Sequence, residues 1–184
     1  GQDTPQDTPQ DTPQDQPQIN KTKLWWAYNS QTGKYGYINE KGEWAIQAQY
    51  DKVRDFTDDV AIVCIAEKYY VIDTTGKTLN STGFDEISNF DYGYATVLIK
   101  GERFVDDRMG LIDKSGNYVI EPIYYELGSV DENGLLPYEL PNTYKSGFIN
   151  TKNEIVIEAK YRNVKPFNNG VACVQTEDLE WGAI

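Results

Sequence analysis

The residues with the greatest capacity for chemistry in this chain are carboxylates that stand close together in the sequence. Paired carboxylates can hydrolyse glycosidic bonds when they lie about 5 to 10 Å apart and one of them has a raised pKa. Carboxylate oxygens can also bind Ca²⁺, which takes roughly six to eight oxygen ligands in an ordered loop. The acidic clusters comprise Asp55, Asp58 and Asp59, then Asp106 and Asp107, and finally Asp131 and Glu132.

The rest of the sequence does not favour either kind of chemistry. None of the acidic clusters matches an EF-hand loop or a glycine-rich calcium repeat. The chain has 29 acidic and 17 basic residues and a net charge of −12, so solvated loop carboxylates are the ordinary explanation. We therefore expect no catalytic, cofactor-binding or metal-binding residues, with a glycoside hydrolase-like enzyme as the remote alternative.

Other residue types exclude further classes of site and partner. The chain lacks histidine, which excludes His-dependent triads and His-ligated metal sites. Cys64 and Cys173 each lie in an apolar run without CxxC spacing, which predicts small buried hydrophobic residues. The negative charge argues against nucleic acid as a partner, and the lack of a long apolar run argues against membrane insertion.

Aromatic residues make up 13% of the chain, and they are the other candidates for a binding surface. About half occupy positions of a repeat, where packing in the core is the expected role. The others are candidates for an exposed platform that would suit a sugar ring or a protein interface: Trp25, Trp26, Trp44, Tyr118, Tyr125, Tyr138 and Tyr144.

A repeat of 34 to 40 residues becomes visible when the chain is aligned with itself. An isoleucine follows each anchor residue by two positions, and in the first four copies Asn or Asp follows by three and Gly or Asn by six. An aromatic residue follows the same four anchors by fourteen positions. The five anchors are Gly36, Tyr70, Gly110, Gly147 and Gly182.

Each unit reads as a β-hairpin followed by a third strand. An Asx residue at the start of a four-residue loop and Gly or Asn at its end are typical of a type I turn closed by a bulge. β-branched and aromatic residues flank these loops, as strands prefer. The loops are Asn39–Gly42, Asp73–Gly76, Asp113–Gly116 and Asn150–Asn153, and the third strands run through 60–63, 94–97 and 171–174.

The sequence therefore predicts an all-β fold of tandem repeats of about 34 to 40 residues, in a domain over residues 24–184. The four units are expected near 35–63, 69–97, 109–138 and 146–174, with partial units at 24–28 and 181–184. Residues 24–28 fit a third strand because Ala27 precedes Tyr35 by the eight residues that separate Ala61 from Tyr69. We expect an open array, because three strands are fewer than a propeller blade usually has; the alternative is a closed ring resembling a small propeller.

Residues 1–23 form a separate segment built from Gln-Asp-Thr-Pro repeats. Four of the eight prolines lie in it, and it has no apolar side chain before Ile19. We expect a disordered tail or an extended spacer that holds the domain away from an attachment point.

The unit that begins at Tyr35-Gly36 and ends at Ala61-Ile-Val63 resembles the bacterial WG-containing repeat. Trp181-Gly182 carries the dipeptide that gives the family its name, whereas Tyr69-Tyr70 lacks the glycine. The resemblance covers roughly residues 24–184 and implies an all-β architecture, often in exported proteins, without an implied set of catalytic residues.

These observations favour a non-catalytic interaction module of an exported bacterial protein, located in the periplasm, on the cell surface or outside the cell. Its partner would be another protein, bound through the repeat surface and the long linkers at 98–108 and 134–144. Insertions in repeat proteins usually gather on one face, often the binding face. A glycan-binding module that uses exposed aromatic residues is the alternative, and the sequence assigns no ligand-binding residue in either case.

Overall fold

The computed structural model describes residues 23–184, so the predicted tail lies almost entirely outside the described residues. The predicted all-β fold is confirmed: the described chain contains seventeen strands and one short 3₁₀ helix, η1 (Phe104–Asp106). The strands form five antiparallel sheets.

The first two sheets contain β1 (Trp25–Asn29), β2 (Lys34–Ile38) and β3 (Trp44–Tyr50), then β4 (Lys52–Val53), β5 (Val60–Ile65) and β6 (Lys68–Asp73). The third contains β7 (Glu86–Ile87), β8 (Tyr94–Ile99), β9 (Arg108–Asp113) and β10 (Tyr118–Tyr124). The fourth contains β11 (Glu126–Leu127), β12 (Leu135–Glu139), β13 (Ser146–Asn150) and β14 (Ile155–Tyr161). The last contains β15 (Asn163–Val164), β16 (Cys173–Gln175) and β17 (Trp181–Ala183).

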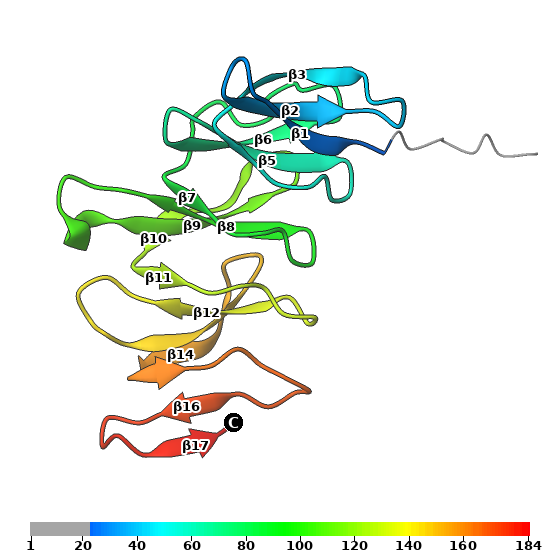
Figure 1. Ribbon diagram of the computed structural model, residues 1–184. Helices are drawn as coiled ribbons and strands as arrows, with labels where there is room; N and C mark the ends of the chain where they lie inside the picture. Colours follow the sequence, from blue (N-terminus) through cyan, green and yellow to red (C-terminus); the bar gives the residue numbers. More distant parts are fainter. Residues whose placement is uncertain (1–22) are drawn as a thin grey trace, which may run out of the picture.

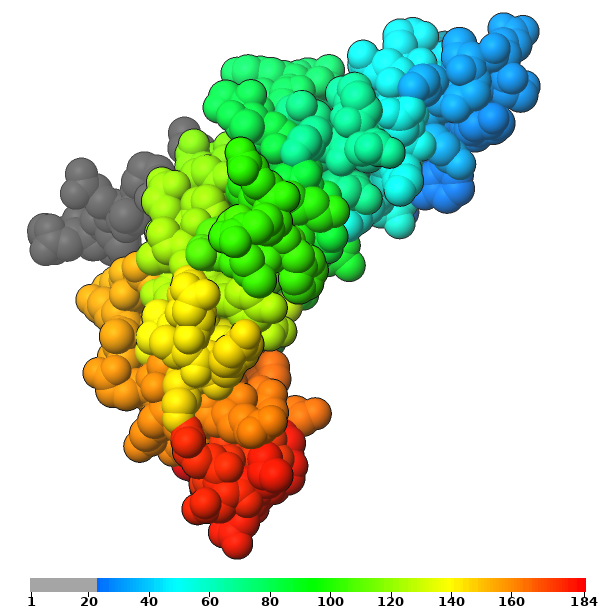
Figure 2. Space-filling model, turned by 90° about the vertical axis from the view of Figure 1, so that its left-hand side faces the viewer, coloured from blue at the N-terminus to red at the C-terminus, as the bar shows by residue number. Residues whose placement is uncertain are grey.

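The five sheets follow one another along an open array (Figure 1). The sheet of β1–β3 and the sheet of β15–β17 lie at opposite ends, so the array does not close into a ring. The molecule is elongated and bent, with the two ends of the described chain far apart (Figure 2). The open array predicted from the sequence is confirmed.

Each sheet combines strands from two successive sequence units. The third strand of one unit pairs with the hairpin of the next, as β8 pairs with β9. A two-residue strand at the corner before each third strand (β4, β7, β11 and β15) completes the pattern, and the expectation of three strands per unit missed it. These strands are too short for an alternating pattern of apolar residues to reveal them.

The expected alignment of the first strand was shifted by two residues. Trp25 lies opposite Ile38, and Ala61 lies opposite Ile72, so Trp25 rather than Ala27 occupies the position of Ala61. The connection after β1 has four residues, whereas the one after β5 has two. Because the expected alignment assumed connections of equal length, it was displaced by this difference of two residues.

The predicted Asx turns are confirmed in detail. The Asn39 side-chain oxygen accepts hydrogen bonds from the amides of Lys41 at 2.9 Å and Glu43 at 3.0 Å. Gly42 has φ +76° and Asn153 has φ +63°, the left-handed conformation that closes such a turn. Asp131 makes the same bonds to the amides of Asn133 and Leu135, both at 2.8 Å.

The hydrophobic core lies between successive sheets. Ile62 of β5 and Val71 of β6 pack with Phe84 and with Ile87 and Val97 of the next sheet, and all five are almost fully buried. A single sheet cannot bury both of its faces alone, so each repeat depends on its neighbours. The isoleucines two positions after the anchors at 70, 110 and 147 are fully buried.

Candidate functional site

The loop that joins the third strand of one unit to the hairpin of the next falls on the same side in every sheet (Figure 1). We call this side the connection side. Its five loops comprise residues 30–33, 66–67, 100–107, 140–145 and 176–180. The turns before the third strands, such as the one around Tyr92, lie on the opposite side.

Exposed aromatic side chains gather in and beside the loops of the connection side. Phe104 is 77% exposed in the loop before β9, and Tyr144 is 73% exposed in the loop before β13. Trp181, at the start of β17, is 54% exposed. The two expected long linkers therefore contribute their loops to one side, although 134–144 also includes all of β12.

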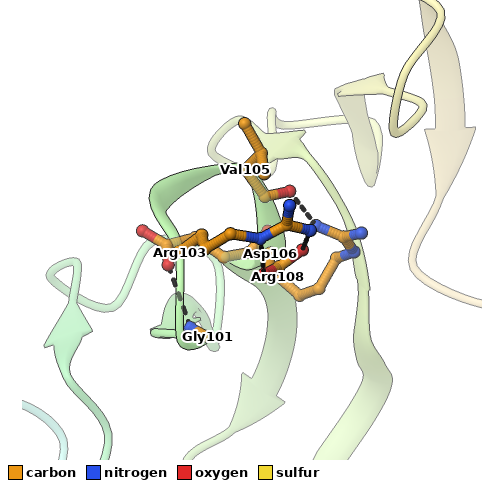
Figure 3. A network of polar contacts seen from close by, with 6 residues as sticks. Gly101, Arg103, Val105, Asp106 and Arg108 are labelled. Carbon is orange, nitrogen blue, oxygen red and sulfur yellow. Dashed lines mark hydrogen bonds and ion pairs between the residues drawn. The ribbon is translucent and has the colours of Figure 1, made fainter.

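The loop at 100–107 is held in one conformation by hydrogen bonds that do not involve its apolar side chains (Figure 3). Arg103 bonds Asp106 with two nitrogens, at 2.9 and 3.0 Å. The amide of Gly101 donates to the Asp107 carboxylate at 2.9 Å. Arg108 donates to the carbonyl oxygens of Val105 at 2.9 Å and Asp107 at 2.7 Å. Phe104 is thus presented on a braced loop.

Charge and burial explain the two aspartates of this loop. The hydrogen bonds from Arg103 hold the pKa of Asp106 below its ordinary value. Asp107 is almost fully buried, contrary to the expectation of a solvated carboxylate, because its side chain closes the loop through Gly101.

Two hollows open on the connection side between successive repeats. The larger, about 780 Å³, lies between the loops at 66–67 and Lys100 and includes Arg54 and Cys64 in its lining. The other, about 460 Å³, lies between the loops at 140–145 and Glu177. Lys100 and Glu177 hold equivalent places after the third strand, so the hollows are equivalent in the repeat.

Ion pairs brace the walls of the larger hollow. Lys34 pairs with Asp51, and Lys68 pairs with Asp85 at 2.6 Å. The Lys34 hydrogen bond, followed by one from the Ala66 amide, lowers the pKa of Asp51. Burial alone would raise the pKa of Asp85, but hydrogen bonds from the Lys100 amide and from Lys68 hold it below its ordinary value.

Two glutamates face each other next to the smaller hollow. Glu126 and Glu139 are directly paired across β11 and β12. Burial, and secondarily the charge of Glu126, raises the pKa of Glu139. Like charges in directly opposed positions destabilise a sheet.

The acidic clusters that the sequence singled out do not converge on one site. Asp58 and Asp59 have φ +49° and +70° in a tight hairpin turn, where Asp is among the favoured residues. Asp131 begins an Asx turn, and Glu132 is exposed within it. Across residues 23–184, no three Cys, Asp or Glu side chains form a group that could hold a metal ion.

The candidate aromatic residues have different environments. Trp25 and Trp26 are 40% and 50% exposed. Tyr118 is partly exposed and packs edge-on against Phe84, with the ring centroids 5.9 Å apart. Tyr138 is buried, so its expected exposure was wrong: it belongs to a buried apolar cluster and packs edge-on against Tyr124, with the ring centroids 5.1 Å apart. Trp44, Tyr125 and Tyr144 complete the set; the first two are half-buried and the third is exposed.

The two cysteines also differ. Cys64 is buried, as expected, and burial raises its thiol pKa. Cys173 is exposed, so the prediction for it was wrong. It occupies the position of Ile62, which the following repeat covers, whereas in the described chain β16 and β17 are the last strands.

The structure also accounts for one feature to which the sequence gave no role. Asn80 is buried, accepts a hydrogen bond from the Val71 amide at 2.7 Å and donates to the Thr82 carbonyl at 2.8 Å. In the part of the chain that is described, no helix has the length and apolar character needed to cross a membrane.

The fold and the connection side define a class of protein: an open tandem array of small antiparallel sheets that displays loops along one side. Four consecutive segments match the family described as WG containing repeat, at residues 35–69, 71–102, 109–144 and 147–179. These segments make up more than half of the chain, and the chain belongs to this family. The resemblance seen in the sequence is confirmed.

Comparison with solved structures supports the fold alone. A chain described as "Crystal structure of the eukaryotic initiation factor" superposes with a TM-score of 0.51 at 14% sequence identity. The match covers 88% of this chain and 48% of that one, so this chain spans about half of that protein's length. No curated protein matches this chain significantly.

Proposed function

We propose that this chain is a non-catalytic interaction module that binds another protein through its connection side. The observation that carries the proposal is that exposed Phe104 and Tyr144 lie in the connection-side loops of two successive sheets, and that exposed Trp181 directly follows the loop of the next sheet. Aromatic side chains are enriched at protein interfaces and supply much of the binding energy there.

The braced loop at 100–107 supports this proposal. Its hydrogen bonds fix the backbone without using Phe104, which contributes little to the core at 77% exposure. A loop that is already ordered loses less conformational entropy when it binds. Phe104 would therefore act as an anchor that enters an apolar pocket of the partner.

We further propose that the protein is bacterial and exported. The support is the resemblance to the bacterial WG repeat and the proline-rich sequence of residues 1–23, which suits a spacer.

Site-specific photocrosslinking tests the proposed interface. Benzoylphenylalanine is introduced separately at positions 104, 144 and 92, and each variant is irradiated in extracts of the source cells. Tyr92 is 66% exposed on the opposite side and serves as the matched control. We expect one shared adduct from positions 104 and 144 that position 92 does not give. The same adduct from all three positions, or none from 104 and 144, would contradict the proposal.

A further inference from the structure

Three aromatic rings form a cluster on one face of the β1–β2 hairpin. The centroid of Tyr35 lies 6.0 Å from that of Trp26 and 5.1 Å from that of Tyr28. The rings of Trp26 and Tyr28 are tilted by 69° and 52° from that of Tyr35, so the cluster presents facets rather than one plane. Trp26 is 50% exposed and Tyr28 is 54% exposed.

Comparison with the next repeat shows that the fold does not require these large side chains. Trp26 lies opposite Tyr37, as Ile62 lies opposite Val71, so Trp26 and Ile62 hold the same position. Tyr28 corresponds to Cys64 by the same pairing. Ile62 and Cys64 are only 4% and 3% exposed. The first repeat thus places two rings partly in solvent where the second has smaller, buried residues.

A fixed polar pair lies at the end of the same hairpin. Lys34, next to Tyr35 in the chain, pairs with Asp51. The second oxygen of Asp51 accepts a hydrogen bond from the Ala66 amide at 2.8 Å, which fixes the carboxylate. Aromatic faces are thus combined with an oriented donor and acceptor.

We propose that this cluster binds a neutral oligosaccharide. The C–H faces of sugar rings stack on the exposed rings of Trp26 and Tyr28, and sugar hydroxyls bond Lys34, Asp51 and the phenol groups. The net charge of −12 disfavours acidic sugars, so the ligand is an uncharged saccharide.

The polar neighbours favour a sugar over an apolar protein segment. An apolar side chain seated on the rings would desolvate Lys34 and Asp51 without hydrogen-bonding them, which costs free energy. Sugar hydroxyls avoid this cost while the ring carbons still cover the aromatic faces. The proposed sugar site does not include Phe104 or Tyr144, so sugar binding can be tested independently of the proposed protein interface.

Isothermal titration calorimetry with defined oligosaccharides tests the site. The probes are pentasaccharides of glucose, of mannose and of N-acetylglucosamine, and an oligogalacturonate tests the charge argument. The variants are Trp26→Ala and Tyr28→Ala, with Trp181→Ala as the control because that tryptophan is 54% exposed at the other end of the array. Thermal unfolding checks that each variant is folded, and the half-exposed Tyr28 provides a variant that leaves the buried core intact.

We expect at least one neutral pentasaccharide to bind, with about tenfold weaker binding in Trp26→Ala and in Tyr28→Ala. Trp181→Ala should bind like the unmodified chain. The proposal is overturned if no neutral probe binds at millimolar concentration, if the acidic probe binds more tightly, or if folded Tyr28→Ala binds like the unmodified chain. A loss of equal size in Trp181→Ala would also overturn it.

Discussion

The Arg54 guanidinium donates a hydrogen bond to the Ile87 carbonyl oxygen at 2.8 Å, and these residues lie in corresponding corners of successive repeats. Further bonds reach the Ser88 carbonyl at 2.8 Å and the Asn89 side chain at 3.0 Å. Hydrogen bonds therefore join neighbouring repeats in addition to apolar packing. This contact also forms part of the wall of the larger hollow.

Replacing Arg54 tests this junction. Arg54→Ala leaves the Ile87 and Ser88 carbonyls without their partner, so we expect the free energy of unfolding to fall by about 1 to 3 kcal/mol. Urea unfolding followed by circular dichroism measures the change. Lys41→Ala, in an exposed turn, is the control and should change stability by less than about 0.5 kcal/mol. Equal effects of the two substitutions would contradict the junction.

The anchor glycines are explained by a close approach of the facing strand. A Cβ atom on Gly36 would lie 2.5 Å from the Ile46 carbonyl oxygen, and one on Gly147 would lie 2.3 Å from that of Ile157. On Gly182 it would meet no atom within 4 Å. We expect Gly36→Ala to destabilise the chain by about 1 to 3 kcal/mol and Gly182→Ala to be nearly neutral, as measured by urea unfolding. A neutral Gly36→Ala would contradict this explanation.

The same argument accounts for the anchor that is not glycine. No regular strand follows β6 in its hairpin, and the segment that approaches Tyr70 contains Gly83 instead. A Cβ atom on Gly83 would lie 2.7 Å from the Tyr70 ring. In the second unit the glycine that permits the close approach therefore lies in the facing segment, at Gly83, and the anchor position is occupied by Tyr70. This arrangement accounts for the departure of the second unit from the family pattern.

Acid should weaken the chain in part through Asp85. Its folded-state pKa is below the ordinary 3.8, so the unfolded chain binds more protons over this interval. The stability that Asp85 contributes is therefore present above about pH 4 and lost as pH falls through the folded-state pKa. Asp85→Asn should flatten the fall in urea midpoint between about pH 5 and pH 2. An unchanged pH profile would show that the Lys100 amide and Lys68 together do not stabilise the ionised Asp85 side chain in the folded chain.

Glu139 should have the opposite effect on the pH dependence of stability. Its folded-state pKa lies above the ordinary 4.5, so the folded chain binds more protons between the two values and stability falls as pH rises through them. Glu139→Gln should raise the urea midpoint at pH 7 relative to the unmodified chain. The gain should shrink near pH 3, where the carboxyl is protonated in both states. The exposed Glu40→Gln is the control, and a loss of stability in Glu139→Gln at pH 7 would contradict the prediction.

Thiol labelling distinguishes the two cysteines. Cys173 is exposed and Cys64 is 3% exposed, with a raised pKa that disfavours the reactive thiolate. We expect one rapid equivalent of Ellman's reagent in the folded chain and a second only in denaturant. Cys173→Ser should abolish the rapid reaction, whereas rapid labelling that persists in this variant would mean that Cys64 is accessible.

The sequence predicts the parts of this fold that rest on local chemistry. Asn39 and Gly42 identify their turn from the sequence. Few side chains other than Asn and Asp can accept the hydrogen bonds of its backbone amides, and few residues other than Gly and Asn readily adopt its left-handed conformation. Exposure was harder to predict, because it depends on which side chains of neighbouring sheets cover a residue. Tyr138 is buried and Cys173 is exposed, and the residues beside them in the sequence indicate neither outcome. The larger hollow was not predictable either: Arg54 and Lys100 line it from sequence units whose pairing became visible only in the stacked sheets.

The most direct test of the binding account is the affinity of the partner that crosslinks to positions 104 and 144. Its dissociation constant is measured by calorimetry for the unmodified chain, for Phe104→Ser with Tyr144→Ser, and for Tyr92→Asn, a residue suited to the positive φ of that turn. We predict that the double variant binds at least about tenfold more weakly and that Tyr92→Asn binds normally. Unchanged affinity in the folded double variant would contradict a binding role for the connection side.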